Sequence, residues 1–339
     1  MSKMRVMVLL HKDLVPPDKK KGEFDRDQVD WLTEWDVATT LKKMGHDVLC
    51  LGVISDLSKI RGAITDFKPH IVYNLLEEFD GEAIFDQNVV SYLELMKIPY
   101  TGCNPRGLIL ARDKGLAKKI LTYHRIKTAP FCSFSKSRKK AKLTKDLIYP
   151  VIVKCQNEEA SLGLTKAALV NNEEKLLERV AFIHNEYKVD AIAEQFIEGR
   201  EFYMGVIGNH RLKTFPAWEL TFEKVESPEK EFYGQSAKWN MGYRKRKGIQ
   251  TGRANLPSDV EKKMADICKR TYRALGLNGY ARIDLRMDKE GQLFVIEANP
   301  NPDIAESDDF AKSAHFSKLS YKNLLKKILS LGLSWYSGE

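Results

Sequence analysis

The first hundred residues alternate apolar, strand-like runs with amphipathic helical patterns, and no other feature restricts the fold of this chain so strongly. In chain order the patterns predict a strand at 5–10, a helix at 30–44, a strand at 47–53, a helix at 56–67, a strand at 70–76 and a helix at 81–96. Strands that are separated by helices usually run parallel, with helices packed on both faces of the sheet. We therefore predict an α/β fold that begins with a doubly wound parallel sheet in residues 1–103.

The rest of the chain has a different order of elements. Asn104-Pro105 starts a helical region that extends to about His124 with a break near Asp113, because asparagine caps helices and proline suits the first turn. The later patterns predict strands at 131–134 and 151–155, a helix at 172–186, several strands within 191–220, a helix at 257–275, strands at 280–287 and 293–297, and a helix at 317–331. We predict a central α+β part, residues 104–193, and a C-terminal α+β part, residues 194–339.

Charge and composition narrow the class of protein. The net charge of +9 favours anionic ligands without identifying one. No uncharged apolar stretch reaches the roughly 18 to 20 residues that span a bilayer, so we predict a cytoplasmic protein with no membrane partner. The five cysteines are odd in number and widely spaced, which favours reduced packing residues over a disulfide framework or a zinc site.

Polar residues mark the last two predicted strands. Arg282 and Asp284 alternate on one strand, and Glu297 and Asn299 end the next, so each pair shares a face. Two carboxylates and an amide oxygen are ligands that Mg²⁺ prefers. The alternative is a hairpin with solvated polar faces, and the pattern alone leaves both open. The chain has no phosphate-binding P-loop and no G-x-G-x-x-G turn, which disfavours the common nucleotide-binding folds.

These residues and several motifs before them resemble the ATP-grasp ligases, specifically the D-alanine:D-alanine ligase-like group. In chain order the matching segments are 98–102 followed by Asp113-Lys114, then 149–154, 194–201, Ala237-Lys238, 279–284 and 295–300. The resemblance covers most of the chain. It implies the ATP-grasp fold, in which the central part is a lid and ATP binds between the lid and the C-terminal part.

The resemblance implies an ATP site built from lysines and one hinge segment. The phosphate-binding lysines would be Lys114, Lys154 and Lys238. The hinge residues around the adenine would be Glu194, Gln195, Phe196 and Ile197. Glu194 would face the purine amino group, and Glu201 would bind the ribose hydroxyls. For an isolated lysine the alternative is an ordinary surface charge, and Glu201 could instead pair with Arg200 or Arg211.

The same resemblance implies a carboxylate–amine ligase. The metal ligands would be Asp284, Glu297 and Asn299, holding two Mg²⁺ ions that Mn²⁺ can replace. A carboxylate would attack the γ-phosphate of ATP, and an amine would then displace phosphate from the acyl phosphate to form an amide or peptide bond. Lys238 and Arg282 would be catalytic, with the Arg282 guanidinium holding the transferring phosphoryl group or the oxyanion. We expect small-molecule or peptide substrates and a homodimer.

The substrate-binding segments depart from the D-alanine ligases. The loop 156–163 has Glu159 and Ala160 where that group has Gly and Ser, and Trp239 stands where it has a tyrosine. We include Ser161 and Trp239 among the candidate substrate contacts. Because the hydrogen bonds that close the site over D-alanine are lost, we expect a different substrate.

The segment after Asn299 departs as well. Its candidate substrate contacts are Asp303, Ser307 and Asp308. Because carboxylates repel a substrate carboxylate, we hypothesise that the nucleophilic substrate presents a cationic group to Glu306, Asp308 or Asp309. The alternative is that Ser307 caps a helix whose first turn contains the two aspartates.

Two basic runs, 136–145 and 244–247, have no assigned role. We expect the first in an exposed loop or short helix and the second in an exposed loop, although 244–247 could also face an anionic carboxylate donor. We expect no nucleic-acid partner, because aromatic residues do not interleave with the basic ones. A competing class is an ATP-binding regulatory protein without turnover. The complete set of predicted metal ligands counts against it.

Overall fold

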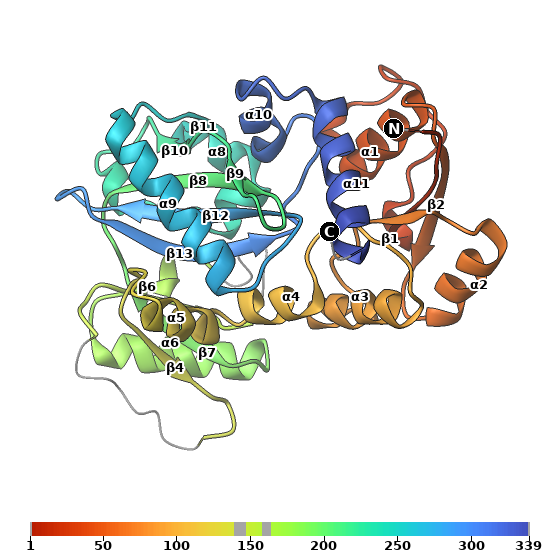
Figure 1. Ribbon diagram of the computed structural model, residues 1–339. Coiled ribbons are helices and arrows are strands. Elements are labelled where there is room, and N and C mark those ends of the chain that lie inside the picture. Colours follow the sequence, from red (N-terminus) through yellow and green to blue (C-terminus); the bar gives the residue numbers. More distant parts are fainter. Residues whose placement is uncertain (1, 139–146, 158–163, 338–339) are drawn as a thin grey trace.

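The computed structural model of the protein describes residues 2–138, 147–157 and 164–337. Within these ranges the strands form three sheets, one parallel and two antiparallel (Figure 1). Helices lie between and around the sheets. The predicted α/β class is confirmed.

The parallel sheet has the strand order β2-β1-β3. Its strands are β1 (Arg5–His11), β2 (Asp47–Val53) and β3 (Ile71–Asn74). Side chains of β1 alternate between two hydrophobic clusters. Met7 and Leu9 pack with residues of α2 and α3, whereas Val6 and Val8 pack with residues of α1 and α11. The sheet is therefore covered on both faces, as the doubly wound prediction requires.

The helices around this sheet include one from the far end of the chain. They are α1 (Leu32–Lys43), α2 (Leu57–Phe67), α3 (Asp86–Leu95) and α11 (Tyr321–Ser337). The predicted helix at 81–96 begins with a separate short 3-10 turn, Ala83–Phe85. In Figure 1, α11 runs back between the six-stranded sheet and the N-terminal sheet. Leu324 and Leu325 are fully buried there, so the C-terminus completes the N-terminal layer.

Two capped helices lead out of the parallel sheet. They are α4 (Pro105–Arg112) and α5 (Lys114–Tyr123). The Asn104 side chain accepts a hydrogen bond from Gly107 N at 3.0 Å, and the Asp113 side chain accepts one from Leu116 N at 2.9 Å. The predicted break at Asp113 is confirmed, because this residue ends one helix and caps the next.

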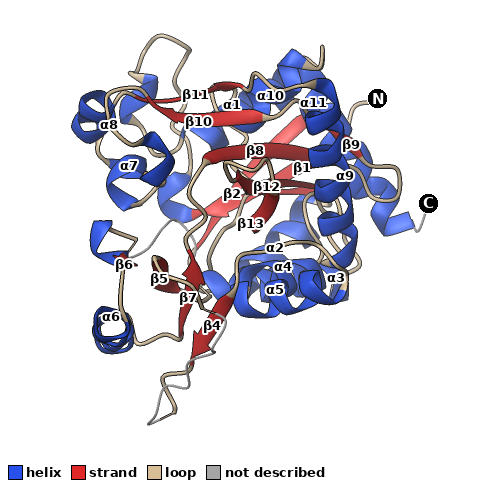
Figure 2. Ribbon diagram, turned by 90° about the vertical axis from the view of Figure 1, so that its left-hand side faces the viewer, coloured by secondary structure: helices blue, strands red, loops and turns tan. Residues whose placement is uncertain are grey.

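The four-stranded antiparallel sheet has the order β4-β7-β5-β6 and is covered by α6 (Figure 2). Its elements are β4 (Phe131–Phe134), β5 (Val151–Cys155), β6 (Leu169–Val170), α6 (Glu173–Glu186) and β7 (Ala191–Gln195), with a short 3-10 turn at Lys166–Ala168. The bounds of β4 and β5 agree with the prediction. Residues 139–145 of the first basic run lie outside the described residues.

The six-stranded antiparallel sheet has the order β11-β10-β8-β12-β13, with β9 beside β8. Its strands are β8 (Arg200–Ile207), β9 (Lys213–Thr214), β10 (Trp218–Phe222), β11 (Ile249–Arg253), β12 (Tyr280–Met287) and β13 (Leu293–Pro300). The helices in this part are α7 (Gln235–Trp239), α8 (Met241–Lys247), α9 (Ser258–Ala274) and α10 (Asp309–Phe316).

The second basic run is helical, so the prediction of a loop at 244–247 is wrong. The Asn240 side chain accepts a hydrogen bond from Tyr243 N at 2.8 Å and caps α8. Gly248, with φ of 61°, ends the same helix. An N-terminal asparagine cap and a C-terminal glycine in the left-handed region are enough to define one short helix.

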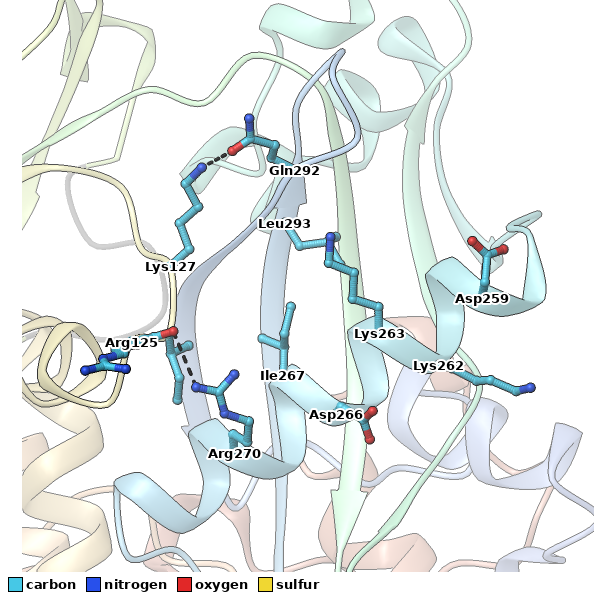
Figure 3. A pocket seen from close by; sticks show the side chains of 11 residues that line it. Arg125, Lys127, Asp259, Lys262, Lys263, Asp266, Ile267, Arg270, Gln292 and Leu293 are labelled. Carbon is cyan, nitrogen blue, oxygen red and sulfur yellow. Dashed lines mark hydrogen bonds between the residues drawn. The ribbon is translucent and has the colours of Figure 1, made fainter.

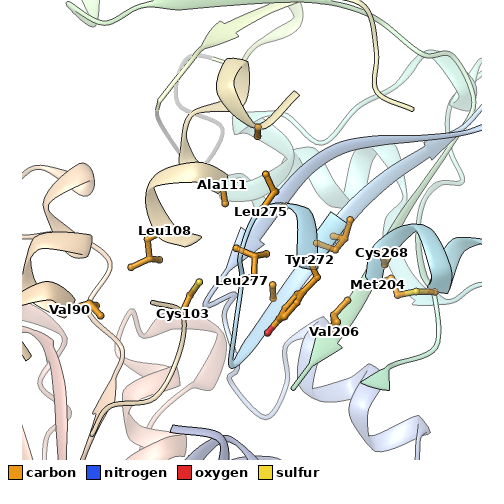
Figure 4. Packing of buried hydrophobic residues seen from close by; sticks show 14 of the residues in the cluster. Val90, Cys103, Leu108, Ala111, Met204, Val206, Cys268, Tyr272, Leu275 and Leu277 are labelled. Atoms are coloured by element: carbon orange, nitrogen blue, oxygen red, sulfur yellow. The ribbon is translucent and has the colours of Figure 1, made fainter. Parts of the chain in front are cut away.

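The largest hydrophobic cluster joins the parallel sheet to the six-stranded sheet. Figure 4 shows Val90 and Leu108 on one side and Met204, Cys268 and Tyr272 on the other. Cys103, Cys132, Cys155 and Cys268 are buried and Cys50 is partly exposed, so four of the five cysteines pack in the interior as predicted. Over the described ranges, the helices are too short or too polar to cross a bilayer.

Candidate active site

Four predicted polar residues lie together on β12 and β13. In this antiparallel pair Asp284 is opposite Glu297, and Arg282 is opposite Asn299. The Arg282 guanidinium donates hydrogen bonds to the Asp284 carboxylate from Nε at 2.8 Å and Nη2 at 2.9 Å, and the Asn299 amide donates another at 2.9 Å. Asp284 is only 6% exposed. Asp284 is therefore paired and buried rather than solvated, whereas Arg282, Glu297 and Asn299 are partly exposed.

The two carboxylates have opposite pKa shifts. Burial raises the pKa of Asp284 to about 6, and the charge of Glu297 adds to the rise while Arg282 opposes it. Burial also favours the neutral form of Glu297, but the charges of Lys114, Lys154 and Arg282 outweigh it and lower its pKa to about 2. Glu297 is therefore ionised at neutral pH and can act as an anionic ligand.

The chemistry of this donor set fits a magnesium ion. Asp284, Glu297 and Asn299 carry carboxylate and amide oxygens on adjacent strands, and hard cations prefer such ligands. Among the residues that the structure describes, no three His, Cys, Asp or Glu side chains form a metal cluster. A set of two carboxylates and one amide leaves much of the coordination shell to phosphate oxygens and water, which is usual for Mg²⁺.

Lys154 and a lysine not predicted from the sequence, Lys118, hold Glu194 between them. The Lys154 Nζ on β5 lies 3.1 Å from Glu194 Oε1, and the Lys118 Nζ on α5 lies 3.1 Å from Oε2. All three side chains are buried. Burial opposes ionisation of Glu194, but the two ammonium groups outweigh it and lower the pKa. Glu194 is therefore a buried carboxylate rather than a neutral acid.

Lys114 extends this line of charges toward β13. It is the first residue of α5, one turn before Lys118, and its Nζ lies 3.9 Å from Glu297 Oε2. Lys118 also donates a hydrogen bond to the Ile296 carbonyl at 3.3 Å. Lysines from α5 and β5 thus face carboxylates from β7 and β13. The structure brings together predicted residues that are up to 183 positions apart in the chain, from Lys114 to Glu297.

The predicted hinge joins β7 to β8 and is fixed through its backbone. The Gln195 N–H donates to the Pro130 carbonyl at 2.8 Å, and the Phe196 N–H donates to the Pro150 carbonyl at 2.9 Å. Ile197 is buried beside them. The hinge backbone is therefore held between β4 and β5, close to Lys154.

Arg286, which was not predicted, holds the other side of the hinge. This buried guanidinium donates to the Gly199 carbonyl at 2.8 Å and lies 4.6 Å from the centre of the Phe196 ring. It also pairs with Glu201 at 3.3 Å. Arg286 lies two residues after Asp284 on β12, so the strand that carries this predicted metal ligand also supports the hinge.

Glu201 lies at the site rather than in a surface ion pair. It accepts a hydrogen bond from the Tyr203 hydroxyl at 2.8 Å in addition to its pair with Arg286. Arg200 pairs with Glu219 at 2.7 Å. The alternative pairing of Glu201 with Arg200 or Arg211 is therefore wrong.

Other predicted residues belong to α7 and to the covering loop. Lys238 and Trp239 belong to α7, and the Lys238 side chain is exposed. Ser161 lies outside the described residues, together with Glu159 and Ala160 of the covering loop. The roles of these residues stay predictions.

The segment after β13 makes defined contacts with the N-terminal part. Asp303 accepts hydrogen bonds from the Thr33 hydroxyl at 2.6 Å and from Ala305 N at 2.9 Å. Asp308 occupies the N-cap position of α10 without a side-chain capping bond. Ser307 precedes it and is exposed, so the expectation that Ser307 caps the helix is wrong.

A basic hollow of about 710 Å³ shares no residue with this group (Figure 3). Lys262, Lys263 and Arg270 of α9 line it, and Lys127 bonds to Gln292 across its edge. Most of the lining side chains are long and solvent-facing, and they come from α9, from the loops around Lys127 and Gln292, and from the start of β13. Its lining residues are not among the lysines and carboxylates of the candidate site.

The arrangement defines a class. Two antiparallel sheets carry lysines on one side and oxygen ligands on the other, with a hinge between them, which is the ATP-grasp arrangement. Over 99% of each chain the fold is similar to a D-alanine–D-alanine ligase from Bacillus anthracis solved with ATP, with a TM-score of 0.75 at 21% identity. It is also similar to VanG D-Ala:D-Ser ligase from Enterococcus faecalis, with a TM-score of 0.73, 17% identity and coverage of 98% of this chain and 100% of that one. The protein is an ATP-dependent ligase.

The chain belongs to the D-alanine–D-alanine ligase family. The family model described as D-ala D-ala ligase C-terminus matches residues 114–330. A D-alanine–D-alanine ligase from Natranaerobius thermophilus is 30% identical over 78% of this chain and 70% of its own length. An uncharacterized protein, y4sG, from Sinorhizobium fredii is 31% identical over 89% of this chain and 88% of its own length.

Proposed function

We propose that the protein is a magnesium-dependent carboxylate–amine ligase that forms an amide or peptide bond through an acyl phosphate. The proposal depends mainly on one observation. The positive charges of Lys114 and Lys154 act on Glu297, and the Arg282–Asp284 pair lies beside it. A triphosphate requires several positive charges, and phosphoryl transfer depends mainly on positioning and charge stabilisation.

The chain's own residues can bind and orient ATP between the two antiparallel sheets. Lys114 and Lys154 now face Glu297 and Glu194, and phosphate oxygens would compete with these carboxylates for the two ammonium groups. Glu194 keeps Lys118 as a partner when Lys154 turns to a phosphate. Lys238 would approach from α7. The hinge residues would hold the adenine, and Glu201 the ribose.

Magnesium, when bound by Asp284, Glu297 and Asn299, would offset the negative charge that grows as phosphate is transferred. An oxygen of the substrate carboxylate forms a bond to the γ-phosphorus as the bond to the ADP oxygen breaks. A neutral amine then attacks the acyl carbon, phosphate departs with the bonding electrons, and the amine gives up a proton. Arg282, released from Asp284, would hold the transferring phosphoryl group or the oxyanion.

The proposal includes a substrate other than D-alanine. Relative to the D-alanine ligases that the sequence resembles, Glu159 and Ala160 replace small residues of the covering loop and Trp239 replaces a tyrosine. Each change removes a small or hydrogen-bonding group next to the substrate. We further propose the division at residues 104 and 194, a homodimer, and two metal ions that Mn²⁺ can replace.

ADP formation with pairs of carboxylates and amines tests the proposal. ADP should appear only when ATP, Mg²⁺, an acid and an amine are all present, and a mass spectrum should show the product joined with loss of water. Glu297→Gln should lower the rate at least about 100-fold, because a charge that acts on phosphoryl transfer is lost. An equally active Glu297→Gln variant, or ADP formation independent of any amine, would contradict the proposal.

A further inference from the structure

The segment after β13 packs against α1 and brings two sets of acidic residues together. The Thr33 hydroxyl donates to Asp303 Oδ1 at 2.6 Å, and Glu306 N donates to Asp36 Oδ2 at 2.8 Å. Glu34 lies between Thr33 and Asp36 on α1. Around this contact the charges of Glu77 and Asp303 act on Glu34, and the charge of Asp303 also acts on Asp308. We define these four residues, Glu34, Glu77, Asp303 and Asp308, as the acidic wall.

Glu34 is the least expected member of the wall. Its side chain is 5% exposed, and Oε2 has no hydrogen-bond partner among the described residues. Burial raises the pKa of Glu34 to about 8, and the charges of Asp303 and Glu77 add to the rise. Buried polar atoms are nearly always paired, so an unpaired carboxyl oxygen beside two further carboxylates requires an explanation.

The acidic wall reaches the centre of the reaction. Burial raises the pKa of Asp308 to about 7, where the charges of Asp303 and Asp309 add to the rise and Arg282 opposes it. Arg282 is thus close enough to act on Asp308. Asp308 in turn acts electrostatically with Asp303, and Asp303 with Glu34. The wall therefore begins at Asp308, on which the charge of Arg282 acts, and ends at Glu34 in the N-terminal part.

The guanidinium groups next to the wall are already paired. Arg282 makes its two hydrogen bonds to Asp284, and Arg26 donates to Asp36 at 2.9 and 2.7 Å. A ligand carboxylate placed against the wall would meet like charges without gaining either guanidinium. A ligand ammonium would meet these carboxylates, and Glu34 Oε2 in particular lacks a hydrogen-bond donor among the described residues.

We infer that the acidic wall binds an ammonium group of the amine substrate, and that this substrate is a diamine-type cation rather than a zwitterionic amino acid. One amino group would reach Arg282 as the nucleophile, while the second stays protonated between Glu34 and Asp303. The ammonium supplies the donor that Glu34 Oε2 lacks. The assignment to a substrate rests on the proposed ligase function, but the binding of the cation does not.

Calorimetry on the full-length protein with Mg²⁺ and a non-hydrolysable ATP analogue tests the inference. We expect 1,4-diaminobutane to bind at least about tenfold more tightly than butylamine or D-alanine, because a charged hydrogen bond inside a protein is worth that much. Glu34→Gln and Asp303→Asn should each weaken diamine binding at least about tenfold. Glu290→Gln, an exposed change at the β12–β13 turn, is the matched control and should leave the affinity unchanged.

The release of protons on diamine binding provides a second readout. An ammonium beside Glu34 favours its carboxylate, so diamine binding to the native protein should release protons at pH 7, seen as binding heats that differ between two buffers. Glu34→Gln should lose this difference. Equal affinity for the three amines, no measurable diamine binding, or unchanged binding by both variants would overturn the inference. Diamine binding without any ADP formation would refute the proposed function and leave the cation site standing.

Discussion

The Glu34 carboxyl links the stability of the protein to pH. Its pKa in the folded protein is about 8, above the ordinary value of 4.5, so the folded state binds the proton more tightly than the unfolded state. That contribution is complete below pH 4.5 and is lost as the pH rises through 8. Glu34→Gln replaces the carboxyl group by a neutral amide of similar shape that does not titrate. The free energy of unfolding of this variant relative to that of the native protein should therefore rise by on the order of 3 kcal/mol between pH 5 and pH 8.5. Urea denaturation at both pH values measures this, and a difference independent of pH would refute it.

Lys118 and Lys119 offer a matched pair on one helix. Lys118 is 1% exposed and bonds to Glu194, whereas Lys119 is exposed. Lys118→Met leaves one oxygen of a buried carboxylate without its partner, and we expect a loss of about 3 kcal/mol in the free energy of unfolding. Lys119→Met should change it by less than about 0.5 kcal/mol. Equal effects of the two changes in chemical denaturation would show that the buried pair has no special role.

Some of these residues could be predicted and others could not, for identifiable reasons. Alternation along two strands places Asp284 and Glu297 on defined faces, so their approach follows from local geometry. Lys118 could have been found, because it lies one turn after Lys114 on the same helix. Glu34 could not, because its surroundings depend on a contact between α1 and the segment at Asp303, far apart in the chain.

The turn between β7 and β8 depends on a glycine. Gly199 has φ of 144°, and a Cβ there would overlap the Met287 carbonyl oxygen on the neighbouring strand. Gly199→Ala should lower the free energy of unfolding by about 2 kcal/mol or more and weaken binding of an ATP analogue, because the hinge must shift. Gly252→Ala on β11, where a Cβ meets no atom within 4 Å, is the control and should be nearly neutral. Unchanged nucleotide affinity in Gly199→Ala would show that the hinge tolerates the shift.

Elements with a clear hydrophobic pattern are easier to predict from the sequence than elements that only capping residues mark at their ends. The strands at 47–53, 131–134, 151–155 and 280–287 have the predicted bounds. The short helix α8 was missed because its polar sequence has no apolar face, and only Asn240 and Gly248 mark its ends. β13 extends to Pro300 rather than Glu297, since pairing with β12 continues through its polar residues.

Two of the three sheets share a hydrophobic cluster, and the third has a cluster of its own. One cluster includes Met7 of the parallel sheet and Ile283 of the six-stranded sheet, so these layers share a core. The four-stranded sheet and α6 have a separate, smaller cluster. Polar contacts add to their attachment to the rest, including the Lys118–Glu194–Lys154 group and a hydrogen bond of 2.9 Å from Gln156 to Asp113. These contacts lie where the nucleotide is proposed to bind.

Hydrogen exchange should reveal this difference. Amides of β4–β7 and α6 should open at free energies at least about 2 kcal/mol below those of β1 and β12, because the separate cluster can detach without breaking the shared core. Mg²⁺ with a non-hydrolysable ATP analogue would bridge the two sides and stabilise the closed form, so exchange in the four-stranded sheet should slow while β1 changes little. The Lys154→Met variant should lose most of that slowing. If all three sheets open at one free energy and respond equally to nucleotide, the four-stranded sheet is not a separately moving lid.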